Sequence, residues 1–235
     1  MALKSNQTYK PQILLLTMGQ KQVFWQALLI TILIFSIGVT AGVVLENWRT
    51  SKIASLYDLS ELSLLDVKLQ TEIYSLGEFN CEQAIQENIA FADRVYEEAK
   101  MLERYEGASR LTAQIEQEHK KYDLLRTMIL LNSIKIKQGC PNRYYEIVYL
   151  YQYNDPSLET KAKQSVFSKL LIELKETKGD QILLIPVAAD NNLASVNLLL
   201  EKYNIEKKDV PLILINRNKK ITTLTTVDEL RKYLE

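Results

Sequence analysis

The sequence predicts an α+β protein in three parts: an N-terminal transmembrane helix, a helical hairpin or coiled-coil-like stalk, and a C-terminal α/β sandwich. Three observations predict this arrangement. An apolar run without a charged side chain occupies 23–45, the chain after it repeats apolar residues at helical spacing, and short β-type runs begin at Tyr144. We therefore divide the chain into a cytoplasmic tail at 1–22, the membrane helix, a stalk at 46–140 and the sandwich domain at 141–235.

The apolar run from Val23 to Leu45 is long enough to cross a membrane. At about 1.5 Å per residue it covers a hydrocarbon core of about 30 Å. A cleaved signal peptide is the alternative, but the apolar part of such a peptide is usually about 7–15 residues long. The small residues at 38–42 also lie inside the run instead of after it. We expect an uncleaved membrane anchor.

The charges on the two sides of this run predict its orientation. The tail before it carries Lys4, Lys10 and Lys21 and no acidic residue, and an excess of cations marks the cytoplasmic side. Arg49 and Lys52 follow the run and weaken the bias. The expected product is a single-pass protein of the cell membrane with a cytoplasmic N-terminus and extracytoplasmic C-terminal domains.

Two glycines inside the run, Gly38 and Gly42, have the G-x-x-x-G spacing that lets two membrane helices approach closely. One interpretation is a homodimer through this helix. Because the spacing is common in membrane helices, the other interpretation is that these small residues are incidental.

Helical spacing continues beyond the run. No Pro or Gly cluster interrupts the chain before Gly77, so the membrane helix is expected to extend outward to about that residue. Apolar residues then recur at three and four between 82 and 106, and again from Ser109 to Gly139, which predicts a three-helix bundle or coiled-coil-like stalk. The apolar stripe of the first stalk helix is formed by Ile53, Leu56, Tyr57, Leu62, Leu65, Leu69 and Ile73.

The two cysteines of the chain, Cys81 and Cys140, bracket the last two stalk helices. Antiparallel helices of similar length bring their outer ends together, so these residues are expected to form a disulfide bond, as is usual outside the cytoplasm. Such a bond closes a loop whose constraint is worth roughly 4 kcal/mol in the chain-entropy model. Two buried free thiols and a redox-active pair are the alternatives.

Composition argues against several functional classes. The 29 Lys and Arg residues are interleaved with 29 Asp and Glu residues, which leaves no basic stripe for nucleic acid. One histidine and two distant cysteines do not make a set of metal ligands. We expect neither a metal nor a cofactor.

The last third of the chain changes to the patterns of an α/β sandwich. Its expected order is βαβ, α, ββ, α, which gives a mixed sheet with one parallel pair. Helices are expected from Pro156 to Gly179, at 193–203 and at 227–234, and strands at 144–153, 181–188, 211–216 and 220–224.

This order resembles the thioredoxin superfamily over residues 143–235. The matching pieces are the strands YLYQY and LLIPVAAD, the helix NLLLEKYNI, Val210-Pro211 leading into LILIN, and the helix VDELRKYL. In that family the Pro at the position of Pro211 is cis, and the residue before it offers its backbone to an extended peptide. The resemblance therefore implies a cis Val210–Pro211 bond and a peptide-binding edge beside it.

The sequence departs from the family at its redox centre. The turn at 154–160 contains no cysteine, and Lys207-Lys208 lengthens the approach to Pro211. The hydroxyls of Ser157 and Thr160 are too weakly acidic to replace a thiol, and the single histidine, His119, belongs to the predicted stalk. Ser157 is expected to cap the following helix with Thr160 at its third position, and no catalytic residue is expected.

These patterns predict a membrane-anchored thioredoxin-like protein without a redox dithiol, acting as a protein- or peptide-binding module or in complex assembly. An atypical thiol–disulfide oxidoreductase that uses Cys81 and Cys140 is one alternative. A structural subunit of a membrane complex, with contacts through the stalk, is the other. The residues expected to bind a protein or extended peptide are Val210, Pro211, Pro156, Ser157 and Thr160.

Overall fold

The structure is a computed structural model of the whole chain, and it describes residues 20–106, 112–141, 144–154 and 156–234. These residues belong to two compact units, Met1–Lys52 and Ile53–Glu235. Most of the predicted tail, with Lys4 and Lys10, and the helix start predicted at Ser109 lie outside the described residues.

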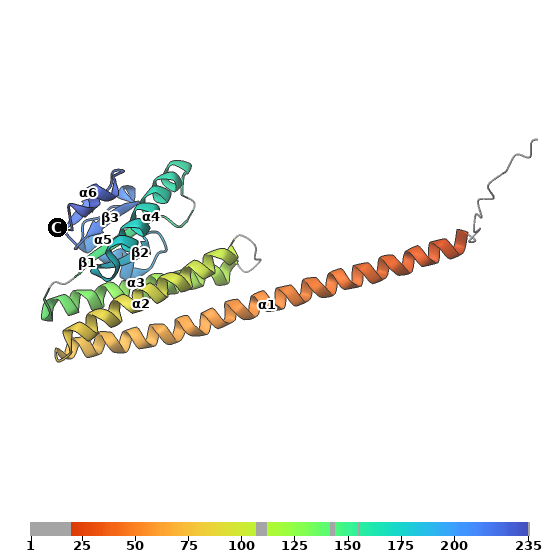
Figure 1. Cartoon of the computed structure of the whole chain (residues 1–235), viewed down its shortest axis with the longest axis horizontal. Coiled ribbons are helices and arrows are strands. Elements are labelled where there is room, and N and C mark those ends of the chain that lie inside the picture. Colours follow the sequence, from red (N-terminus) through yellow and green to blue (C-terminus); the bar gives the residue numbers. More distant parts are fainter. Residues whose placement is uncertain (1–19, 107–111, 142–143, 155, 235) are drawn as a thin grey trace, which may run out of the picture. The chain divides into compact units, whose positions relative to one another are not determined.

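In the first unit the described residues belong to helix α1 (Gln20–Leu76) (Figure 1). Its segment Gln22–Ser51 is long and apolar enough to cross a membrane, and almost all of its side chains are exposed. This confirms a helix fit to span a bilayer. A Cβ atom added at Gly38 or Gly42 would meet no other atom within 4 Å among the described residues. These glycines therefore contact no other described segment of this chain, and the homodimer stays a prediction.

The second unit is built on a mixed four-stranded sheet in the order β2-β1-β3-β4. β1 pairs in parallel with β2 and antiparallel with β3, and β3 pairs antiparallel with β4. The α+β class and the mixed sheet are therefore confirmed. The strands are β1 (Tyr145–Tyr151), β2 (Ile182–Ala188), β3 (Leu212–Ile215) and β4 (Lys219–Ile221).

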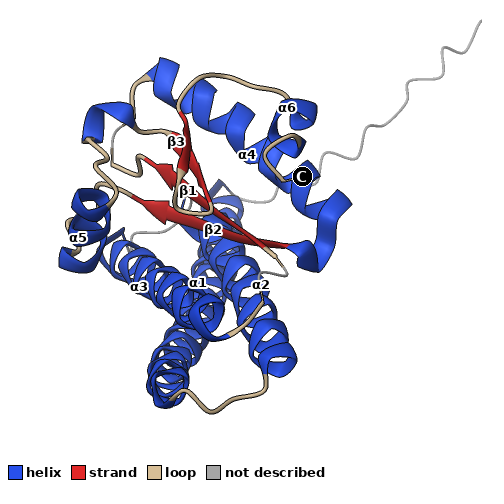
Figure 2. Ribbon diagram, turned by 90° about the vertical axis from the view of Figure 1, so that its left-hand side faces the viewer, coloured by secondary structure: helices blue, strands red, loops and turns tan. Residues whose placement is uncertain are grey.

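Helices cover both faces of this sheet (Figure 2). The predicted order of elements is confirmed, although the closing helix and the last strand are shorter than expected. Two short 3-10 turns, η1 (Gly179–Gln181) and η2 (Lys207–Asp209), precede β2 and β3. One face carries α4 (Leu158–Lys178) and α6 (Val227–Arg231), and the other carries α2 (Cys81–Glu106), α3 (Thr112–Gly139) and α5 (Ala194–Lys202).

Alternation along β1 separates the two cores. Val148 and Leu150 join the core that contains the helical hairpin of α2 and α3, whereas Ile147 and Tyr149 join the core under α4 and α6. The sequence leaves open whether the hairpin packs against the C-terminal third. The structure shows that it does, because one continuous core contains residues of α2, α3 and the sheet.

The outer part of α1 contacts the hairpin through an unexpected face. Val67 and Tyr74 are buried, and Thr71 Oγ1 donates to Asn132 Oδ1 of α3 at 2.6 Å. The stripe expected from the sequence lies on the opposite side of the helix, because Leu65 and Leu69 are each two residues from Val67, a rotation of about 200° around the helix axis. Its described members Leu62, Leu65, Leu69 and Ile73 are between 51% and 66% exposed.

The predicted disulfide is present between Cys81 and Cys140, whose Cα atoms are 5.6 Å apart. Cys81 is the first residue of α2, and Cys140 follows the last residue of α3. The bond therefore joins the start of α2 covalently to the end of α3.

A buried carboxylate connects α3, β1 and the β3–β4 turn. Glu146 of β1 is fully buried, and Ser133 of α3 donates to its Oε1. Arg217 Nε lies 2.7 Å and Lys137 Nζ 3.8 Å from its Oε2. Burial lowers the pKa of Lys137, while Glu146 opposes this effect.

The same network holds an unusual turn. Asn216 and Arg217 have φ angles of 47° and 62°, both in the left-handed region, as a type I′ hairpin turn requires. Asn216 Oδ1 accepts from the backbone N–H of Glu146 at 3.0 Å. Backbone and side chain of Glu146 therefore both fix a turn that lacks the glycine commonly found there.

Replacing the buried carboxylate tests this network. Glu146→Gln keeps the shape but leaves the cations of Lys137 and Arg217 without their anion, so we expect the free energy of unfolding to fall by about 3 kcal/mol. The measurement is denaturant unfolding of the full-length protein in detergent micelles. The exposed Glu173→Gln on α4 is the matched control, expected within about 0.5 kcal/mol of the native protein. Equal effects of both variants would contradict the role of Glu146.

Candidate functional site

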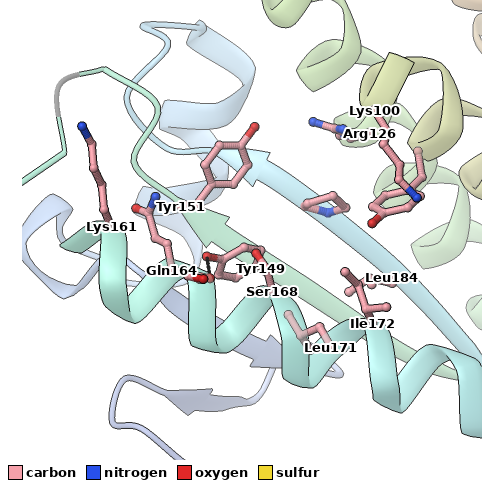
Figure 3. Close-up of a pocket in the computed structure, with 13 residues that line it drawn as sticks. Lys100, Arg126, Tyr149, Tyr151, Lys161, Gln164, Ser168, Leu171, Ile172 and Leu184 are labelled. Carbon is pink, nitrogen blue, oxygen red and sulfur yellow. Dashed lines mark hydrogen bonds between the residues drawn. The ribbon is translucent and has the colours of Figure 1, made fainter. Parts of the chain in front are cut away.

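A cavity of about 520 Å³ opens between the helical hairpin and α4, beside β1 and β2 (Figure 3). This volume lies within the range of about 300–1,000 Å³ that is usual for small-ligand sites. Figure 3 shows Lys100 and Arg126 on the hairpin side and Lys161, Gln164 and Ser168 on α4. The cavity is therefore walled by segments that are distant in sequence.

Alternation in the strands builds the floor of the cavity. Tyr149 and Tyr151 of β1 and Leu184 and Pro186 of β2 share the face toward α4. The two tyrosine rings stack with centroids 5.7 Å apart. The Tyr149 hydroxyl donates to the carbonyl of Gln164 at 3.2 Å, and burial raises the pKa of Tyr149 to about 12, so its phenol stays neutral at physiological pH.

A second cavity of about 320 Å³ continues the first toward the other end of α4. Both are lined by Tyr96 and Lys100 of α2, Ile172 of α4 and Leu184 of β2. The ion pair between Asp93 and Lys175 (Oδ1–Nζ 3.0 Å) lies in this second part. We call the two cavities together the α2–α4 cleft. It follows the outer side of β2, the edge strand of the sheet.

Arg126 is the buried cation of the α2–α4 cleft. It is 5% exposed, and its Nη1 lies 3.4 Å from Asp123 Oδ1. Burial by itself would lower the pKa of Arg126, but Tyr151 and Asp123 beside the guanidinium raise it above its usual value. Arg126 is therefore charged in a largely dehydrated position.

The carboxylate that faces Arg126 has other partners too. Asp123 accepts from the backbone N–H of Ala188 at 3.2 Å and from the side-chain amide of Asn191. Burial raises the pKa of Asp123, while Arg126, these hydrogen bonds and His119 lower it. Asp123 Oδ1 therefore serves both the end of β2 and the cation, while Oδ2 accepts from Asn191.

The loop after β1 is held by residues from two other segments. Asp190 accepts from the backbone N–H groups of Tyr153 and Asn154, each at 2.8 Å. Gln164 of α4 bonds both backbone groups of Gln152, at 2.9 and 3.2 Å. The segment 152–154 is thus fixed at the carboxyl end of the parallel strands, where α/β sheets usually bind ligands.

The structure confirms the predicted cap of α4. Ser157 Oγ accepts from the backbone N–H of Thr160 at 3.1 Å, and Ser157 is the N-cap residue. Both side chains therefore already have a structural role. Pro156 is half-buried next to them.

Val210 and Pro211 lie elsewhere. Their peptide bond is cis, as the resemblance implies. Val210 is partly buried against the hairpin core, and Pro211 is buried. Neither residue lines the α2–α4 cleft, and no hydrogen bond within the described part of the chain joins them to Pro156, Ser157 or Thr160. The peptide-binding edge stays a prediction.

His119 occupies a different environment from the one expected. The sequence assigns it to a stalk, without a neighbour in the C-terminal domain. In the structure it is buried, and its ring centroid lies 4.3 Å from that of Tyr153. The reason is that α3 packs directly on the sheet, so His119 reaches the loop after β1.

The cleft residues on the hairpin were missed by the sequence argument. A signal for Arg126 exists, because it lies four residues after Tyr122 and three before Ile129, on the apolar face of α3. A cation in such a position needs a buried partner or a ligand. Tyr149 and Tyr151 lie in the expected strand at 144–153, but spacing alone does not tell which face of that strand meets α4.

The described residues contain no candidate metal site, because no group of three or more His, Cys, Asp and Glu side chains among them could hold an ion. Comparison of the chain with models of protein families, with curated proteins and with solved structures gives no match. The functional argument therefore rests on the geometry of this chain.

Removing the carboxylate of Asp190 tests how the loop is held. Asp190→Ala leaves the N–H groups of Tyr153 and Asn154 without their acceptor, so their amide exchange is expected to accelerate at least about tenfold. Hydrogen–deuterium exchange of the full-length protein measures this. Asp180→Ala, an exposed acid before β2, serves as control and should leave both amides unchanged. Unchanged exchange in Asp190→Ala would show that other contacts fix the loop.

Proposed function

We propose that this protein is a membrane-anchored binding module that works without a redox dithiol. The observation that carries the proposal is the α2–α4 cleft, which combines a ligand-sized volume, a buried arginine and aromatic walls. Pockets with mainly apolar walls and a few placed polar groups are typical of ligand-binding sites. The helix Gln20–Leu76 supports the membrane anchor.

The sheet supports a thioredoxin-like assignment for the C-terminal third. A parallel βαβ unit is followed by an antiparallel hairpin, in the strand order β2-β1-β3-β4, with α4 starting after the turn at the end of β1. That turn has no cysteine. The flanking charges of the apolar segment support an extracytoplasmic position for this domain.

The bond between Cys81 and Cys140 fits a structural role in this proposal. It joins the two ends of the helical hairpin, and neither cysteine lines the α2–α4 cleft. An oxidoreductase that uses this pair is the alternative, and it requires a disulfide that is easily reduced. A second alternative, a structural subunit of a membrane complex, draws on the exposed stripe of α1 at Leu62, Leu65, Leu69 and Ile73.

The binding proposal is tested by cross-linking from the cleft. Ile172, which lines both cavities and is 40% exposed, is replaced by photoreactive p-benzoylphenylalanine in the full-length protein in its native membrane. We expect an adduct, seen as a mass increase of the protein. Leu198 on α5, 66% exposed and outside the cleft, is the control position and should give none. Equal adducts from both positions, or none from Ile172, would refute the proposal.

A redox titration separates the binding module from the oxidoreductase. The disulfide closes the hairpin, a constraint worth roughly 4 kcal/mol, so we expect a midpoint potential below about −300 mV and no reduction of insulin. Mass spectrometry of the full-length protein in redox buffers, after trapping of free thiols, measures the reduced fraction of Cys81 and Cys140. A potential between about −120 and −270 mV, the range of exchange proteins, would support the oxidoreductase.

A further inference from the structure

Arg126 has a donor that the fold does not use. Its Nε has no hydrogen-bond partner within the described part of the chain, and the residue is only 5% exposed. Tyr151 and Asp123 also hydrogen-bond the guanidinium. Its counter-charge, Asp123, also serves Ala188 and Asn191. A buried guanidinium with an unused donor at a cavity wall is a place where an anion gains more than in water.

The other charges of the main cavity have the same sign. Lys100 of α2 and Lys161 of α4 line it from opposite walls, and among the described residues no Asp or Glu side chain lines it. Glu97, 3.8 Å from Lys100, lines the second cavity and not the main one. The main cavity therefore presents three cations to its contents, which favours an anionic ligand over a neutral or cationic one.

The remaining walls require an apolar body on that ligand. Tyr149, Leu171, Ile172 and Leu184 supply aromatic and aliphatic surface next to the cations. Pro186 has no backbone N–H, so the outer side of β2 is a poor template for an added strand at this point. Recognition in the cleft therefore depends on side chains and suits a compact ligand or a chain end.

We propose that the α2–α4 cleft binds a carboxylate attached to an aromatic or branched apolar group, with the carboxylate at Arg126. This inference rests on the proposed binding function and specifies its ligand. The unused donor, Nε, serves one oxygen of a carboxylate, whereas a phosphate brings three strong acceptor oxygens that need further donors. A free aromatic acid and the C-terminus of a peptide share this chemistry.

Titration calorimetry of the full-length protein in lipid nanodiscs tests the ligand class. The probes are 3-phenylpropionate, N-acetyl-Leu-Phe with a free carboxylate, the amide of each, and phenyl phosphate. We expect each acid that binds to do so at least about tenfold more tightly than its amide, because a hydrogen bond to a charged group is lost. Tighter binding of 3-phenylpropionate identifies a small acid as the source, and tighter binding of the dipeptide identifies a chain end.

Two substitutions locate the carboxylate. Arg126→Gln is expected to abolish the difference between acid and amide, and Lys161→Gln to reduce acid affinity about threefold to tenfold. Lys161 is exposed, so its variant stays informative if Arg126→Gln does not fold. Lys169→Gln, an exposed lysine on α4 outside the main cavity, is the matched control and should leave affinity unchanged.

Several results would overturn the inference. They are equal affinity for acid and amide, tighter binding of phenyl phosphate than of either acid, equal effects of Lys161→Gln and Lys169→Gln, or no binding of any acid. The cross-link from Ile172 distinguishes failure of the ligand class from failure of the binding function. An adduct there together with no acid binding would reject this ligand class and leave the binding function intact, whereas loss of both would reject both.

Discussion

The burial of α3 on nearly all sides is the constraint on which the rest of the second unit depends. This helix lies between α2 and the sheet, so its polar side chains are forced to find partners in other elements. Asn132 meets α1, Ser133 meets Glu146 of β1, and Asp123 meets the end of β2. Each of these bonds fixes one element against α3, which makes this helix the reference for the whole unit.

The candidate site follows from the same constraint. Asp123 accepts a hydrogen bond from the backbone N–H of Ala188 at the end of β2. Arg126 lies one turn further along α3 and is buried beside Asp123, with which it forms an ion pair. Because α4 covers the opposite face, the guanidinium meets the first turns of α4 across a cavity instead of across packed side chains. The position of Arg126 in the cleft therefore follows from the packing of the hairpin on the sheet.

Local patterns predicted most elements, and long-range packing explains what they missed. The strands, the cap at Ser157 and the bond from Cys81 to Cys140 depend on alternation, short-range hydrogen bonding and helix length, which the sequence shows directly. The surroundings of His119 and Arg126 depend on which face of α3 meets the sheet. The packing face of α1 was predicted wrongly for a related reason, since Val67 and Tyr74 contact the hairpin in place of the expected stripe.

The two edges of the sheet have a consequence for crowding. β2 carries Pro186 on one edge, and β4 on the other is short and carries the exposed Lys219 and Lys220. Proline and lysine on edge strands discourage a strand of another molecule from extending the sheet. With the membrane anchor that we propose, copies would collide in two dimensions, and these residues would keep neighbouring domains from aggregating through their β-strands.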